Sequence, residues 1–127
     1  MGSAFRCMDR LHHLATAVAD FVAQREWEPY HHPKDLAVSI AIESSELLER
    51  FQWRSPREVE RLLQDAEYRR GVEEEMADVL IYLVALANRL KVDLPAAALA
   101  KLERNARKYP AEEFRGKAHR DQEKPGG

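Results

Sequence analysis

Nine consecutive residues, from position 79 to position 87, are apolar (VLIYLVALA). The run is well short of the ~20 apolar residues that a membrane-spanning helix needs. It is also too uniform to give a helix with one apolar and one polar face, which is the usual pattern at the surface of a domain. We therefore expect a helix that is buried on most sides, either inside a bundle or at an interface between subunits.

The other segments have the apolar periodicity of helices. In the first segment Leu14 and Val18 belong to a series at three- and four-residue spacing, and glycine and proline are scarce and lie mostly between such segments. Ser55, Asp65 and Asp93 stand where helices are expected to begin, and their side chains can cap these N-termini. The expected helices cover residues up to about 25, 33–51, 56–63, 65–91 and 95–109.

These segments predict an all-α fold, a bundle of four to five helices that assembles into a homo-oligomer. A chain of 127 residues is too short to give two domains a sufficient core, so we expect one domain over residues 1–110. Residues 111–127 are mostly polar and are predicted to be a mobile tail. A single short bundle covers the run at 79–87 poorly, which favours burial of this helix against a second copy.

The charge balance and the cysteine content exclude several classes of function. The chain has 20 basic and 22 acidic residues, for a net charge of −2, and it lacks the positive field of a protein that binds a nucleic acid polymer. Its one cysteine excludes an internal disulfide and a multi-cysteine zinc site. No apolar stretch of signal-peptide length begins the sequence, so we expect a cytoplasmic protein without a membrane partner.

Four acidic residues lie where apolar side chains are expected. At about 100° per residue, Glu43 falls within the apolar stripe of the helix over 33–51, and Glu46 lies beside it. Glu75 and Asp78 repeat this arrangement on the next long helix. Burial of one unpaired carboxylate costs several kcal/mol. Such a group of acids therefore requires protonation, basic partners or a divalent cation.

A divalent cation is the interpretation that these residues favour. Oxygen ligands without cysteine suit a hard ion, and Mg²⁺ is the expected occupant, with Mn²⁺ as the alternative. Mg²⁺ is commonly bound by carboxylates together with substrate phosphates, which indicates phosphate chemistry. Two alternatives stay open at this point. Acid pairs at this spacing are common on solvated helix faces, and a di-iron bundle also uses carboxylates, although it normally needs Glu-x-x-His pairs.

The pattern Glu43-x-x-Glu46 followed by Glu75-x-x-Asp78 resembles the signature of the all-α nucleoside triphosphate pyrophosphohydrolases, the MazG-like superfamily. The similarity covers residues 10 to 110, and the sequence around the signature resembles the dCTP pyrophosphatase branch. Six blocks carry this finer resemblance: Arg25–Glu28 (REWE), His31–Pro33 (HHP), Glu46–Trp53 (ELLERFQW), Asp78–Leu83 (DVLIYL), Val92–Pro95 (VDLP) and Asn105–Pro110 (NARKYP).

The resemblance implies an enzyme that hydrolyses a nucleoside triphosphate between its α- and β-phosphates, giving a nucleoside monophosphate and pyrophosphate. It implies that the four acids Glu43, Glu46, Glu75 and Asp78 are both the Mg²⁺ ligands and the catalytic residues. It further implies a homodimer or a homotetramer, with active sites completed across subunits. Six residues are expected to contact the substrate: Trp27, His31, Trp53, Tyr82, Asn105 and Lys108.

Each of these assignments has a plainer alternative. Tyr82 can be a core aromatic residue, and His31 can be an exposed residue of a loop. The dCTP pyrophosphatases carry a histidine nine residues before the tryptophan that matches Trp27, whereas this chain has Val18, which cannot form a side-chain hydrogen bond. The preferred base therefore stays open, with dUTP and phosphoribosyl-ATP as alternative substrates. A non-catalytic module that binds nucleotide or protein is the alternative from another class.

Overall fold

The computed structural model describes residues 3–117, and it describes the burial of side chains from Arg10 onward. No strand occurs within residues 3–117, so the predicted all-α class is confirmed. The helices follow one another in the order α1 (Ser3–Gln24), the 3₁₀ helix η1 (Glu28–Tyr30), α2 (Pro33–Glu49), α3 (Pro56–Leu62), α4 (Ala66–Leu90), α5 (Leu94–Lys108) and α6 (Ala111–Phe114).

Side-chain caps fix the starts of three helices where the sequence predicts them. The side chain of Ser55 accepts a hydrogen bond from the backbone N–H of Glu58 at 3.2 Å, at the start of α3. Asp65 and Asp93 accept in the same way at the starts of α4 and α5, both at 3.0 Å. Such caps satisfy backbone N–H groups that have no partner inside the helix, so they set the first residue of each helix.

The helix α2 begins as predicted and ends earlier than predicted. Pro33 occupies its first turn, and Nδ1 of His32 accepts a hydrogen bond from the backbone N–H of Lys34 at 3.2 Å. The helix ends at Glu49 rather than at residue 51. Turns follow, and Trp53 adopts a left-handed backbone conformation with φ 67°. A left-handed residue cannot belong to a right-handed helix, so Trp53 lies outside α2.

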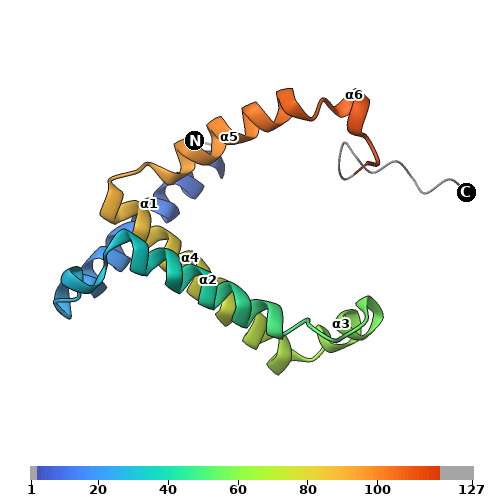
Figure 1. Cartoon of the computed structure of the whole chain (residues 1–127), viewed down its shortest axis with the longest axis horizontal. Helices are drawn as coiled ribbons and strands as arrows, with labels where there is room; N and C mark the ends of the chain where they lie inside the picture. Colours follow the sequence, from blue (N-terminus) through green and yellow to red (C-terminus); the bar gives the residue numbers. More distant parts are fainter. Residues whose placement is uncertain (1–2, 118–127) are drawn as a thin grey trace, which may run out of the picture. The chain divides into compact units, whose positions relative to one another are not determined.

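The chain divides into two compact units between Val92 and Asp93. In the first unit α2 and α4 lie side by side and run in opposite directions (Figure 1). The helix α1 also contacts α4, and Nδ2 of Asn88 donates a hydrogen bond to the backbone carbonyl of Ala15 at 3.0 Å. The buried core at this junction consists of Val18, Leu36, Val84 and Ala85.

The apolar run at 79–87 is only partly buried within one chain. Val84, Ala85 and Ala87 are at most 8% exposed, whereas Leu80 and Ile81 are each 41% exposed. One chain therefore leaves much of this helix uncovered, and the expectation of burial on most sides is not met inside the described bundle. Within residues 3–117 no helix combines the length and the apolar content that crossing a membrane requires.

The second unit contains α5 and α6. The helix α6 lies in the segment that was expected to be a mobile polar tail. For residues 111–114 that expectation was wrong, because they form a helical turn. The rings of Tyr109 and Phe114 meet edge to face with centroids 5.2 Å apart, and this contact joins the end of α5 to α6. The rest of the expected tail, from residue 118 onward, lies outside the described residues. The predicted domain boundary at residue 110 stays a prediction.

Candidate active site

Three of the four predicted acids meet between α2 and α4. Glu43 comes from α2, and Glu75 and Asp78 come from α4. One carboxylate oxygen from each of them lies within 4.8 Å of the others. Glu43 and Glu75 are partly buried, and Asp78 is exposed at the edge. The antiparallel packing of two apolar stripes brings these side chains together, because both stripes carry acids at the same level.

The electrostatics of Glu43 show that the fourth acid belongs to the same group. Burial raises the pKa of Glu43 above its ordinary value of 4.5, and the neighbouring Glu46, Asp78 and Glu75 raise it further. Glu46 is itself exposed and lies three residues, nearly one helical turn, beyond Glu43 on α2. We call these four residues the carboxylate cluster. Their mutual repulsion means that the cluster is held together against its own charge.

The carboxylate cluster fits a divalent cation. Oε2 of Glu43 is buried and has no hydrogen-bond partner among the described residues, although buried polar atoms are normally paired. A positive ion among the four carboxylates would satisfy this oxygen and would offset the repulsion. The available ligands are carboxylate oxygens, which suit hard ions such as Mg²⁺ and Mn²⁺.

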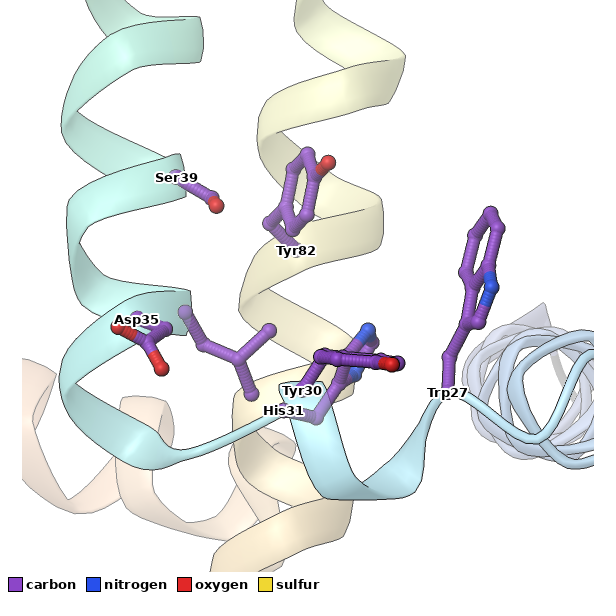
Figure 2. Close-up of a pocket in the computed structure, with 7 residues that line it drawn as sticks. Trp27, Tyr30, His31, Asp35, Ser39 and Tyr82 are labelled. Atoms are coloured by element: carbon purple, nitrogen blue, oxygen red, sulfur yellow. The ribbon is translucent and has the colours of Figure 1, made fainter.

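A pocket of about 280 Å³ lies beside the cluster and contains three of the predicted substrate-binding residues. Figure 2 shows Ser39 of α2 and Tyr82 of α4 facing one another, with Trp27 on the side formed by the segment that follows α1. The indole of Trp27 meets the ring of Phe21 edge to face, with centroids 5.7 Å apart. We call this site the aromatic pocket; its lining residues are Trp27, Tyr30, His31, Asp35, Leu36, Ser39 and Tyr82.

The aromatic pocket and the carboxylate cluster are adjacent along the same two helices. Ser39 precedes Glu43 by four residues, and Tyr82 follows Asp78 by four residues, so each pair is one helical turn apart. Sequence reasoning identified Tyr82 in this way and missed Ser39, although the same spacing would have found it. The aromatic pocket therefore lies about one helical turn from the carboxylates on both helices.

A second pocket of about 490 Å³ contains two arginines that the sequence reasoning missed. Nη2 of Arg50 lies 3.4 Å from Oε1 of Glu75, a member of the cluster. The guanidinium of Arg54 stands over the ring of Tyr68, 5.5 Å from its centroid. Both the Arg54 guanidinium and the Tyr68 hydroxyl donate hydrogen bonds to the backbone carbonyl of Arg50. We call this site the arginine pocket; its lining residues are Glu46, Glu49, Arg50, Arg54, Tyr68 and Glu75.

Gly71 explains how Arg50 fits against α4. The sequence suggests that this glycine weakens the first turns of the helix, since glycine costs ~1 kcal/mol relative to alanine inside a helix. The helix nevertheless continues through Gly71, which is buried. A Cβ atom at this position would lie 2.7 Å from Nη1 and 2.8 Å from Cζ of Arg50. The absence of a side chain at Gly71 thus makes the space in which the guanidinium rests.

Three predicted substrate-binding residues are not brought into these pockets. Trp53 is 93% exposed in the turns after α2, beyond the opposite end of that helix from Trp27. Asn105 and Lys108 belong to α5, in the second unit of the chain. Asn105 is partly buried, and Nζ of Lys108 lies 5.3 Å from the centroid of the Tyr109 ring. The assignment of these three residues to substrate stays a prediction.

The model of the MazG-like family matches residues 38–123, which include all four acids of the carboxylate cluster. The chain belongs to the MazG-like family. The resemblance that the sequence motifs indicate is thereby confirmed, and the cluster lies in the region that defines the family.

Individual relatives agree with this MazG-like assignment. The chain is 43% identical to dCTP pyrophosphatase 1 of Homo sapiens and 42% identical to that of Bos taurus, each over 109 residues. These alignments cover 86% of this chain and 64% of each relative, so the chain spans just under two thirds of their length. A crystal structure of a pyrophosphatase from Archaeoglobus fulgidus is 45% identical with a TM-score of 0.74, covering 80% of this chain and 93% of that one.

Proposed function

We propose that this chain is a metal-dependent nucleotide pyrophosphohydrolase, which cleaves a nucleoside triphosphate into a nucleoside monophosphate and pyrophosphate. The observation that carries the proposal is the position of the carboxylate cluster directly beside the aromatic pocket, on the same two helices. A site for a ring system next to a site for a cation suits a nucleotide whose phosphates are bound through metal. The names of the relatives, dCTP pyrophosphatase 1 and pyrophosphatase, support the same reaction.

The proposed metal ligands are the carboxylates of Glu43, Glu75 and Asp78, together with Glu46. Mg²⁺ is the proposed ion, and Mn²⁺ is the expected substitute, because both take oxygen ligands. When bound, such an ion neutralises phosphate charge and makes a water molecule more acidic. The buried oxygen of Glu43 that lacks a hydrogen-bond partner among the described residues supports this assignment.

The chain's own residues orient the substrate and move the proton. Trp27 offers an indole face on which a base can stack, and Tyr82 and Ser39 offer hydroxyl groups at the side nearest the cluster. One carboxylate of the cluster accepts the proton of the attacking water as a general base. Asn105 and Lys108 are proposed to bind phosphate oxygens, an assignment that rests on the family resemblance.

We propose dCTP as a preferred substrate, on the strength of the relatives' names. Val18, which stands where those relatives are expected to carry a histidine, is 7% exposed and packs in the core with Leu36 and Val84. It cannot select a base by hydrogen bonding. Base selection in this chain is therefore assigned to the aromatic pocket, and hydrolysis of dUTP or phosphoribosyl-ATP is the competing possibility within the family.

The active form is proposed to be a homodimer or a homotetramer. Large apolar side chains on α2 and α4 are exposed in one chain, including Val38, Ile42, Met76 and Leu80 at 50%, 52%, 56% and 41%. Surfaces of this kind mark interfaces between proteins. Sedimentation velocity at micromolar concentration tests the proposal, which predicts a species of two or four chains. An active monomer under these conditions would contradict it.

A second copy also offers Trp53 a way to reach a nucleotide. Trp27 and Trp53 lie beyond opposite ends of α2, whose 17 residues span about 25 Å. In a two-fold dimer whose α2 helices run antiparallel, the end of α2 that precedes Trp53 lies near the beginning of the partner's α2. We propose that Trp53 completes the aromatic pocket of the partner subunit.

The proposed function is tested by measuring pyrophosphate and monophosphate from a panel of deoxynucleoside triphosphates. The account predicts that at least one of them, with dCTP first, yields both products in equal amounts when Mg²⁺ is present. It predicts no products in excess chelator. A protein that binds a non-hydrolysable triphosphate analogue with Mg²⁺ but turns over no member of the panel would be a non-catalytic module instead.

A further inference from the structure

The arginine pocket and the aromatic pocket lie on opposite sides of the carboxylate cluster. Along α2 the order is Ser39, Glu43, Glu46 and Arg50, and at 1.5 Å per residue Ser39 and Arg50 are about 16 Å apart. Along α4 the order is reversed, from Tyr82 through Asp78 and Glu75 to Tyr68, because the two helices are antiparallel. A ligand that begins in the aromatic pocket and crosses the cluster therefore arrives at the two arginines.

We propose that the arginine pocket binds the β- and γ-phosphates of the substrate and holds the pyrophosphate product before its release. This inference rests on the proposed function and deepens it by assigning a site to the leaving group. A guanidinium offers a planar fork of N–H donors that matches phosphate oxygens, and it stays charged at any physiological pH. No other part of the two pockets offers this chemistry, since the aromatic pocket is lined by rings, hydroxyl groups, His31 and Asp35.

Both arginines are held in place before any phosphate arrives. The guanidinium of Arg50 rests on the bare backbone at Gly71 and contacts Glu75 at 3.4 Å. The guanidinium of Arg54 is fixed by its hydrogen bond to the carbonyl of Arg50 and by the ring of Tyr68 below it. Arg50 has five N–H donors and needs few of them for Glu75. Less side-chain freedom is therefore lost on binding than for arginines in solvent.

The acids of the same pocket predict that binding depends on a cation. Glu46, Glu49 and Glu75 line the arginine pocket together with the two arginines. Without a divalent ion in the cluster these carboxylates repel an anion. An ion bound to Glu46 and Glu75 neutralises these carboxylates and so removes most of their repulsion of an anion. Pyrophosphate is therefore expected to bind well only when Mg²⁺ is present.

The test is calorimetric titration of the full chain with inorganic pyrophosphate, with and without Mg²⁺, followed by the same titration with dCMP. Arg54→Gln is the main variant, because Arg54 contacts no member of the cluster in the described contacts. The expected result is a Kd for pyrophosphate that rises roughly tenfold to a hundredfold, the loss that removal of a charge-assisted hydrogen bond produces. The Kd for dCMP stays unchanged.

Two further variants separate this role from a general effect of lost charge. Arg69→Gln is the matched control, since Arg69 pairs with Glu73 on an exposed part of α4 and is expected to leave both Kd values unchanged. Gly71→Ala keeps every charge but places a Cβ at 2.7 Å from Nη1 of Arg50, so it displaces this guanidinium. It is expected to weaken pyrophosphate binding without weakening dCMP binding. Circular dichroism confirms that each variant is folded.

The outcomes are decisive in both directions. If Arg54→Gln and Gly71→Ala change the pyrophosphate Kd no more than Arg69→Gln does, the proposal is wrong. If both variants weaken dCMP as much as pyrophosphate, the arginines support the whole site and the assignment to the leaving group is also wrong. A wild-type protein that binds Mg²⁺ and pyrophosphate through Arg54 yet hydrolyses no triphosphate would overturn the proposed function while leaving this site standing.

Discussion

The two pockets on either side of the carboxylate cluster use the same two helices and offer opposite chemistry. The aromatic pocket presents Trp27, Tyr30 and Tyr82, whose rings suit a flat and largely neutral ligand. The arginine pocket presents Arg50 and Arg54, whose guanidinium groups suit an anion. The contrast indicates a ligand with a ring system at one end and negative charge at the other. The proposed substrate, a nucleoside triphosphate, has this arrangement.

The largest effect is expected at the carboxylate cluster, which lies between the two pockets. Asp78→Asn removes one anionic ligand and is predicted to lower pyrophosphate release by about a thousandfold or more, since metal catalysis supplies several kcal/mol of transition-state stabilisation. Glu46→Gln is expected to act similarly. Steady-state assays at saturating Mg²⁺ measure the loss. Glu73→Gln is the control, because Glu73 is an exposed acid of α4 that pairs with Arg69. Activity of Asp78→Asn within tenfold of wild type would contradict the assignment of Asp78 as a metal ligand.

The second-largest effect is expected in the aromatic pocket. Trp27→Ala is predicted to raise the KM for dCTP roughly tenfold to a hundredfold with a smaller change in kcat, because stacking of a base on an aromatic ring contributes about 1–3 kcal/mol. The same variant leaves the affinity for inorganic pyrophosphate unchanged, the converse of Arg54→Gln. Trp27→Phe keeps a ring and should recover most of the loss. Equal weakening of dCTP and pyrophosphate would show that the two pockets are not separate.

A moderate effect is expected at the exposed apolar surface of α4. Leu80→Lys places a charge where a second copy is proposed to pack, so the sedimentation coefficient should fall to that of a single chain. Turnover should fall with it if Trp53 completes the partner's aromatic pocket. Glu74→Lys, an exposed position on another side of the same helix, is the matched control and keeps the wild-type assembly. An unchanged oligomer in Leu80→Lys would remove this surface from the interface.

The smallest effect is a change in the stability of the metal-free protein. The pKa of Glu43 is raised in the folded state, chiefly by burial, so the folded protein binds more protons there than the unfolded chain does. Its stability therefore falls as pH rises from the unfolded pKa of 4.5 through the folded pKa.

Glu43→Gln is expected to raise the Tm of the metal-free protein by a few degrees at pH 7 and to leave it unchanged at pH 4. Differential scanning calorimetry in the presence of chelator measures both values. Addition of Mg²⁺ should raise the Tm of the wild type more than that of the variant. A variant that is less stable than the metal-free wild type at pH 7 would show that Glu43 is not destabilised by its neighbours.

Local signals in the sequence predict the helix starts and the carboxylates well. The caps at Ser55, Asp65 and Asp93 act within three residues, so they can be identified from the chain alone. Helical periodicity places Glu43 and Glu75 on the apolar stripes of their helices, so it predicts that both acids face a partner helix. The pair of Arg50 and Gly71 could not be found in this way. Their contact depends on the axial register of two helices, which no local signal in the sequence specifies.

Other differences also have physical causes. The short helix α6 is accompanied by the ring contact between Tyr109 and Phe114, which the mostly polar composition of this segment does not indicate. Trp53 has a left-handed backbone in the turns after α2 and is 93% exposed, and the apolar periodicity of the sequence specifies neither property. The four-residue spacing that identified Tyr82 could also have identified Ser39. It was missed because a serine on a helix offers no chemical signal until its neighbours are known.

The most direct test of the account is ³¹P NMR of dCTP incubated with the protein and Mg²⁺. The account predicts that the resonances of dCTP are replaced by those of dCMP and pyrophosphate in equal amounts, without orthophosphate, and that chelation of the metal stops the reaction. Appearance of dCDP and orthophosphate would contradict it, because the bond broken would then lie between the β- and γ-phosphates.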